Sequence, residues 1–288
     1  MFREDIINQI NMVRNKAVII GIIVLILGLI IFGAILAIRS RSKQDITATP
    51  LPEVSTLTKT IEDIPPNQRP FVALVPSDDG HWLTLYIDNV KNALTIEYEL
   101  VYETEGPTQG AIGTIDLKSR TPPIEEKILL GTESKGKFKF DEGVEKGFLG
   151  LVFREENQDV KYQTDFHLQT AAQAKKTLNS LDKKFTFISQ ANLASGFYIS
   201  MSTIGFPQTP EGEIVTGPYG IFSSSSSKNF GKITLETVKP PAKVQIFGWD
   251  KNNNKSKEYT TGIKITDNSI SVEIPQLATF IIVNQKNP

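Results

Sequence analysis

The polar residues Asp250, Asn252 and Asn254 have the spacing that begins a calcium-binding loop. A hard cation such as Ca²⁺ takes carboxylate and amide oxygens from alternate positions of such a loop. The rest of the pattern is missing, because Lys255 stands where the loop needs glycine and Thr261 where it needs a bidentate glutamate. We therefore interpret residues 250–254 as a polar hairpin loop and predict no metal ligands here.

The sequence lacks the set of residues that nucleophilic catalysis usually requires. The two histidines are His81, beside a turn, and His167, within a strand pattern, and the chain has no cysteine. Thiolate chemistry, disulfides and cysteine-bound zinc are thereby excluded. The serine run 223–227 contains neither a Gly-x-Ser-x-Gly elbow nor a Ser-x-x-Lys motif with its downstream boxes. We expect both histidines to be structural and the serine run to be a surface loop.

Paired carboxylates could serve a glycosidase. Glu97, Glu99 and Glu103 alternate along one predicted strand and face solvent. Only a measured separation would assign two of them as an acid and a nucleophile or base. We predict that the protein is not an enzyme and uses no cofactor. An envelope hydrolase acting on glycan or peptide stays as the alternative.

Three aromatic residues are the candidates for partner binding. Trp82, Tyr86 and Trp249 lie near turns or on the strand face opposite the main aliphatic stripe. An exposed aromatic ring in such a place can stack on a protein, a peptide or a glycan. Packing of the same rings in the core or at its rim is the favoured alternative.

A long apolar run predicts how the chain is anchored. Residues 17–38 read AVIIGIIVLILGLIIFGAILAI, which is long enough to cross a hydrocarbon core of ~30 Å as a helix. The run is longer than the core of a signal peptide and is followed by Arg39, Arg41 and Lys43, so we predict an uncleaved anchor. Basic residues are balanced across the run and do not decide orientation. The short tail (1–16) and the Thr/Pro-rich stalk (39–69) favour a cytoplasmic tail and extracytoplasmic domains.

The balance of acidic and basic residues limits which macromolecules the chain can bind. Beyond residue 43 the chain carries 25 basic and 30 acidic residues. A nucleic acid needs a basic face to neutralise its phosphates, so we predict no nucleic-acid partner.

Short runs with a period of two begin at Phe71, and turn residues separate them. This pattern is typical of half-buried strands, and the clearest case is 94–103. In the first half, strands are expected at 71–75, 82–88, 94–103, 111–117, 126–130, 137–140, 148–153 and 160–168. In the second half, they are expected at 184–189, 197–203, 212–216, 219–224, 231–237, 243–249, 259–265, 269–274 and 278–283. The sequence thus predicts an all-β protein with two tandem antiparallel β-sandwich domains, at 70–170 and 177–284, behind one N-terminal transmembrane helix. Residues 171–178 are a short helix or a bridge.

The second half also resembles a known family. The order FTFISQANLASGFYISMSTIG, TGPYGIFSSSSSKNFGKITLE, KVQIFGWD and SISVEIPQLATFIIV is similar to ZU5-like β-sandwich modules. Some members of that group cleave themselves with a histidine base and a hydroxyl nucleophile. The matching positions here hold Gln276 and Ala278, so the resemblance implies an uncleaved chain. Residues 70–168, with DEGVEKGFLGLVFR and TDFHLQ, resemble Ig-like ectodomains of uncharacterised single-pass bacterial membrane proteins.

These observations combine into one expectation of function. We predict a single-pass bacterial membrane protein that binds or scaffolds an envelope protein or glycan at the cell surface, without catalysis. The sequence does not decide whether the chain also self-associates into a homo-oligomer. A membrane-bound sensor or assembly factor that signals through residues 1–16 is a further alternative.

Overall fold

The computed structural model describes residues 57–208, 210–225 and 229–284, and these belong to one compact unit. The predicted tail, transmembrane helix and first part of the stalk lie outside the described residues. Across the described ranges, no helix combines the length and apolar character needed to span a bilayer. The later part of the predicted stalk forms strand β1 (Leu57–Lys59) and two 3₁₀ turns, η1 (Ile61–Asp63) and η2 (Pro66–Gln68).

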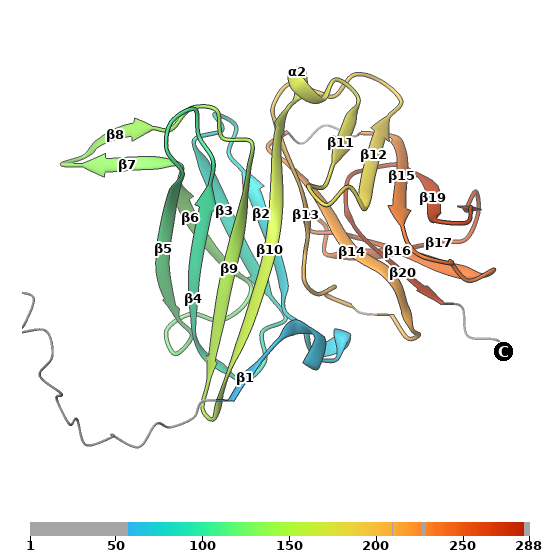
Figure 1. The fold of residues 1–288 in the computed structure, drawn as a ribbon, viewed down its shortest axis with the longest axis horizontal. Coiled ribbons are helices and arrows are strands. Elements are labelled where there is room, and N and C mark those ends of the chain that lie inside the picture. Colours follow the sequence, from blue (N-terminus) through green and yellow to red (C-terminus); the bar gives the residue numbers. More distant parts are fainter. Residues whose placement is uncertain (1–56, 209, 226–228, 285–288) are drawn as a thin grey trace, which may run out of the picture. The chain divides into compact units, whose positions relative to one another are not determined.

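The fold is all-β, which confirms the predicted class, and its largest sheet runs through both halves of the chain (Figure 1). Along this sheet the strands follow the order β17 (Lys255–Tyr259), β16 (Val244–Asp250), β20 (Thr279–Asn284), β14 (Ile214–Ser223), β13 (Phe197–Ser202), β10 (Gln158–Thr170), β9 (Lys146–Glu155), β4 (Ala93–Tyr102) and β5 (Gln109–Asp116). Strand β1 adds to β10 in parallel, and the other neighbours are antiparallel.

Three smaller sheets complete the described structure. The first contains β2 (Phe71–Pro76), β3 (Trp82–Asp88) and β6 (Ile124–Leu129). The second contains β11 (Thr177–Asn179), β12 (Phe185–Ser189), β15 (Gly231–Glu236), β19 (Ser269–Ile274) and β18 (Lys264–Ile265). The third is the hairpin of β7 (Gly131–Ser134) and β8 (Lys137–Phe140), and the one α-helix within the described ranges is α2 (Ala171–Ala174).

Most predicted strands are present, with two corrections in the second half. The runs expected at 212–216 and 219–224 form the single strand β14, with an irregular register between Ile214 and Tyr219. The prediction of one strand at 259–265 is wrong. There the chain ends β17 at Tyr259, turns at Gly262 with a φ of +73°, and then forms the two-residue strand β18. Glycine adopts this left-handed backbone without the steric cost that a side chain brings.

Two hydrophobic cores lie on opposite faces of the large sheet. The first core joins β2, β3 and β6 to that sheet, and the second joins β12, β15 and β19 to it. Strands β14 and β20 supply both cores, because adjacent side chains of a strand point to opposite faces. Phe222 and Ile281 enter the first core, whereas Ile221, Phe280 and Ile282 enter the second.

Phe71 joins residues that are far apart in the sequence. Its ring lies edge-on to Trp249 at 4.8 Å between centroids and to Tyr86 at 5.8 Å. The adjacent Val72 N–H donates to the Thr203 carbonyl at 3.0 Å. Residues of the predicted second sandwich therefore help to build the core of the first. The domain boundary near 170–177 stays a prediction.

Replacing Phe71 with alanine should destabilise both predicted sandwich ranges, 70–170 and 177–284, together. Loss of a fully buried phenylalanine costs about 3–5 kcal/mol. We expect Phe71→Ala to lower amide protection in β19, in the second core, as well as in β3, measured by hydrogen exchange. Phe230→Ala is the control, because that ring is 50% exposed. Unchanged protection in β19 would show that the two cores unfold independently.

Candidate functional site

Three segments that the sequence analysis treats separately surround one cavity of about 490 Å³. We call it the three-loop cavity, and its rim consists of Ser223–Ser225, Asp250–Asn253 and Gln276–Thr279. The strand order explains why they meet. Strands β14 and β16 flank β20 and run antiparallel to it, so their ends lie beside its beginning. The volume is within the ~300–1,000 Å³ of small-molecule sites.

Asp250 organizes one side of the cavity. Its Oδ1 accepts the Asn252 N–H at 2.9 Å, and its Oδ2 accepts the side-chain amides of Asn253 at 2.5 Å and Gln276 at 2.7 Å. Asn254 accepts the indole N–H of Trp249 at 3.3 Å. The Asp250 carboxylate and the Asn254 amide oxygen thus already accept hydrogen bonds from the protein, as expected of a polar hairpin loop.

Lys251 ties this loop to the first core. Its Nζ lies 4.5 Å from the centroid of the Tyr86 ring and 3.7 Å from Glu125 Oε1. Burial raises the pKa of Tyr86, and the charges of Asp88 and Glu125 raise it further. The ammonium group therefore rests between a π face and a carboxylate, which fixes the position of the loop. Sequence reasoning missed Lys251, because its contacts are more than a hundred positions away.

The inner wall of the cavity is apolar apart from one hydroxyl. Phe222 and Ala278 are buried there, and Thr279 is 1% exposed. The Thr279 Oγ1 atom has no hydrogen-bond partner in the described structure. A buried unpaired hydroxyl costs about 1–3 kcal/mol, and this oxygen lies beside Gly220 with almost none of its surface open to the cavity.

Two of the predicted partner-binding aromatics, Tyr86 and Trp249, meet at Phe71 in the first core, whereas Trp82 packs elsewhere. Trp249 lines the three-loop cavity but is 1% exposed, and Tyr86 is buried beneath Lys251. Trp82 is half-buried and lies edge-on to Phe138, with 5.7 Å between ring centroids. Trp249 and Tyr86 pack in the core, which is the alternative that the sequence analysis favours.

Both histidines contact neighbouring groups. His81 stacks on Phe140 with ring centroids 3.8 Å apart, and its Nδ1 is 3.4 Å from Asp79 Oδ2. His167 Nδ1 is 2.8 Å from the Asn179 carbonyl. Neither histidine lines the three-loop cavity.

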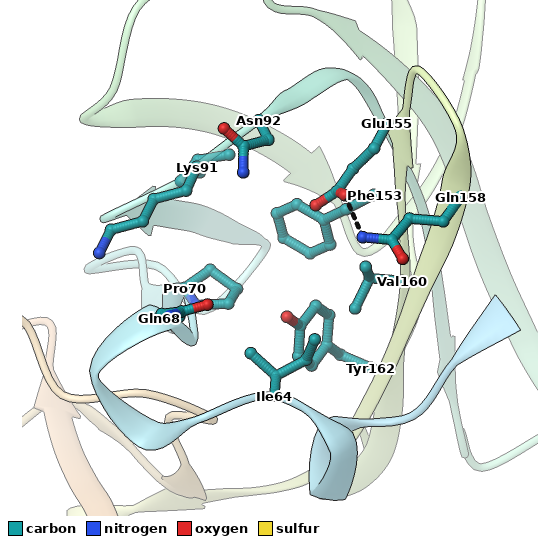
Figure 2. A pocket seen from close by; sticks show the side chains of 11 residues that line it. Ile64, Gln68, Pro70, Lys91, Asn92, Phe153, Glu155, Gln158, Val160 and Tyr162 are labelled. Carbon is teal, nitrogen blue, oxygen red and sulfur yellow. Dashed lines mark hydrogen bonds between the residues drawn. The ribbon is translucent and has the colours of Figure 1, made fainter. Parts of the chain in front are cut away.

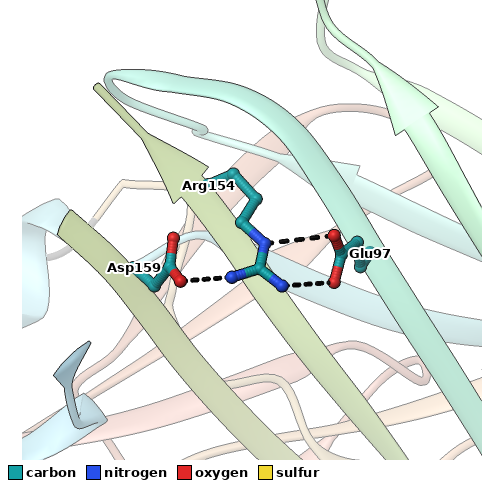
Figure 3. Close-up of polar contacts among 3 residues, drawn as sticks. All are labelled: Glu97, Arg154 and Asp159. Carbon is teal, nitrogen blue, oxygen red and sulfur yellow. Dashed lines mark hydrogen bonds and ion pairs between the residues drawn. The ribbon is translucent and has the colours of Figure 1, made fainter. Parts of the chain in front are cut away.

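Two of the three predicted solvent-face carboxylates, Glu97 and Glu103, form ion pairs, and Figure 3 shows the pair of Glu97 with Arg154. Arg154 Nε and Nη2 donate to the two Glu97 oxygens at 3.1 and 2.7 Å, and Nη1 bonds Asp159. The hydrogen bond from Arg154 lowers the pKa of Glu97. Glu103 pairs with Lys146 at 2.9 Å. Arg154 thus links β4, β9 and β10 on the face of the sheet.

A second cavity lies between η1, η2 and the β9–β10 hairpin (Figure 2). Phe153, Val160 and Tyr162 form its apolar floor, and Gln158 donates to Glu155 at its rim at 2.6 Å. Its volume is about 100 Å³. This is well below the ~300 Å³ that small-molecule sites need, so it has room for a few waters.

No protein-family model matches the chain, and no curated protein is significantly similar to it. The resemblances to ZU5-like and Ig-like sandwiches therefore stay predictions. In the structure, the Gln276 side-chain amide donates to Asp250, and Ala278 is buried immediately before β20.

Removing calcium should leave stability unchanged. A cation at Asp250 would displace three N–H donors, and the described residues contain no group of three metal-ligating side chains. We expect the same melting temperature in a calcium chelator as in added CaCl₂. A melting temperature several degrees higher with calcium would reveal a site that these contacts do not show.

The charge of Asp250 should be detectable at Tyr259. Burial, followed by the charge of Asp250, raises the pKa of Tyr259 to about 12. Folding therefore favours the neutral phenol, and this stability is present below pH about 10 and lost as the pH rises through about 12. Asp250→Asn should lower the pKa of Tyr259, as measured by NMR titration of labelled tyrosine.

Tyr162 provides the internal control for this titration. Burial and then Glu155 raise its pKa to about 12, without a contribution from Asp250. Its titration should not move in the Asp250→Asn protein. An equal shift of both tyrosines would indicate a general loosening of the fold instead of the loss of one charge.

Proposed function

We propose that this chain is a membrane-anchored binding or scaffolding protein, with its β-rich part outside the cytoplasm and with the three-loop cavity as the contact site. The observation that carries the proposal is the convergence of three polar segments on one cavity at adjacent strand ends. Loops held by a rigid sheet are where binding residues commonly occur. The predicted anchor and stalk support the placement at the cell surface.

The chemistry of the cavity favours a neutral polar partner. Its rim offers amides and hydroxyls, its wall is apolar, and the two charged side chains, Asp250 and Lys251, are engaged within the protein. Hydroxyls that accept one hydrogen bond can still donate another. Such groups suit the amides of a peptide segment or the hydroxyls of a glycan, as an envelope protein or cell-wall polymer presents them.

The same contacts support a role without catalysis. A general base must reach the proton that it removes from a substrate. The Asp250 oxygens instead accept amide donors, and the ammonium of Lys251 lies over Tyr86. We infer that these groups shape the cavity and that binding uses the neutral groups around them.

The absence of native cysteine allows a direct test on intact cells. Asn252 is exposed at the cavity rim, and Val238 is 87% exposed elsewhere, so Asn252→Cys and Val238→Cys each introduce one accessible thiol. We expect a membrane-impermeant maleimide to modify the Val238→Cys protein readily on cells. It should modify the Asn252→Cys protein several-fold more slowly on cells than after purification, because the partner covers the cavity.

Each other outcome contradicts one part of the proposal. If neither thiol reacts until the membrane is opened, the β-rich part faces the cytoplasm. If both react on cells at the rates measured for the purified proteins, the cavity is not covered by a partner. Circular dichroism of both variants verifies that the substitutions leave the fold intact.

A further inference from the structure

The edge strand β5 lacks the features that normally prevent strands from pairing with other chains. Sheet edges are usually protected by charged residues, proline or short length. Strand β5 has eight residues, Gln109–Asp116, without proline and with its only charge at Asp116. At the other end of the large sheet, β17 carries Lys255, Lys257 and Glu258 among five residues.

The smaller sheets have protected edges. Strands β11 and β18 have three and two residues, and β6 carries Glu125, Glu126 and Lys127. Strand β2 is covered on its outer side, where Val72 donates to Thr203. Among the edge strands that the structure describes, β5 alone combines this length with a single charge, at its last residue.

Strand β5 is also open to a partner. It pairs only with β4, and residues 109–115 make no other backbone hydrogen bond within the described structure. Gly110, Ile112 and Thr114 are exposed, and the Ile112 side chain is 81% exposed. Ile112 borders a groove of about 640 Å³ on the outer face of β4, β5, β9 and β10. A large apolar side chain thus stands beside unpaired backbone.

We propose that β5 pairs with β5 of a second copy of this chain, in an antiparallel register with Ile112 opposite Ile112. The sequence 109–115, Gln-Gly-Ala-Ile-Gly-Thr-Ile, is nearly self-complementary around this residue. Gly110 lies opposite Thr114, and Ala111 opposite Gly113, so small residues meet small or β-branched ones. Asp116 lies opposite Thr108, and no charges of like sign meet.

This register accounts for both the exposed Ile112 side chain and the unpaired backbone of β5. Directly opposite side chains of an antiparallel pair lie about 4.5–5.5 Å apart at Cβ on the same face, so the two Ile112 side chains cover each other. The outward N–H and C=O groups of both strands gain partners at the same time. Two-fold symmetry then joins the two large sheets into one, and such self-complementary interfaces are the commonest among oligomers. The inference is independent of the three-loop cavity.

A disulfide tests the register in the full chain, purified in mild detergent. Directly opposite residues have Cα atoms about 4.5–5.5 Å apart, which suits a disulfide. We expect mild oxidation to shift most of the Ile112→Cys protein from 32.0 kDa to twice this mass on a non-reducing gel. Reductant should reverse the shift.

Two control variants distinguish specific pairing of the β5 strands from cross-linking by random collision of two chains. Thr114→Cys lies on the same strand and face, but in this register its two copies are on the order of 14 Å apart along the strands. Val238→Cys is 87% exposed on another surface. Both should stay monomeric under the same oxidation. Cross-linking of either control as complete as that of Ile112→Cys would overturn the proposal, as would a monomeric Ile112→Cys protein or its capture of a different polypeptide.

A cysteine-free variant tests the same contact by charge. Ile112→Lys places two ammonium groups opposite each other, and like charges directly opposite destabilise a strand pair. We expect sedimentation to show loss of the dimer in Ile112→Lys and its retention in Ile112→Val. An unchanged melting transition shows that Ile112→Lys still folds. A native chain that sediments as a monomer, or an Ile112→Lys protein that stays dimeric, would contradict the inference.

Discussion

Burial on both faces of β13, β14, β16 and β20 is the constraint on which the rest of this structure depends. Each of these strands supplies the first core with one set of side chains and the second core with the alternate set. Polar side chains are therefore rare along them, and the hydroxyls of Ser200 and Thr279 are buried without partners in the described structure. Polar groups can gather only where these strands end. The three-loop cavity lies at such ends, at Ser223, Asp250 and Thr279.

The strands at the other side of the large sheet have a different environment. Strands β4, β5 and β9 have one face in the first core and one in water, so more buried and more exposed positions alternate along them. The wet face carries the ion pairs of Glu97, Arg154 and Asp159. It also ends at an edge that no other described strand covers. The same sheet thus offers a loop-lined cavity near one end and an open strand at the other.

The contrast between strands buried on one face and strands buried on both faces explains which parts of the fold could be predicted from the sequence. Strand β4 is evident from its period of two, since only one of its faces is buried. Strand β20 is recognisable as a strand, but its continuous Phe280–Val283 run does not show which core each side chain enters. The polar neighbours of Trp249 suggest an exposed ring, whereas the strand directs that ring toward Phe71. Strand β7 has no apolar pattern and is formed only by its pairing with β8.

The order of strands in space also limits prediction of the site. Asp250 and Gln276 are noticeable in the sequence for separate reasons, namely the loop spacing and the ZU5-like resemblance. Their hydrogen bond depends on β20 lying beside β16, and Lys251 reaches Tyr86 only because β2 and β3 pack against the same sheet. Pairings of this kind join distant segments, and no local pattern encodes them.

The aromatic cluster at Phe71 bears on how the protein is synthesised. A ribosome releases β2 and β3 long before it releases Phe222, Trp249 and Ile281, which complete the same core. Until those residues emerge, the apolar faces of the early strands lack their cover. Contacts between such distant segments slow folding, and exposed strand surfaces favour aggregation in the interval. We therefore expect a truncated product that stops before β20 to be aggregation-prone, because it exposes the apolar faces that the later residues cover.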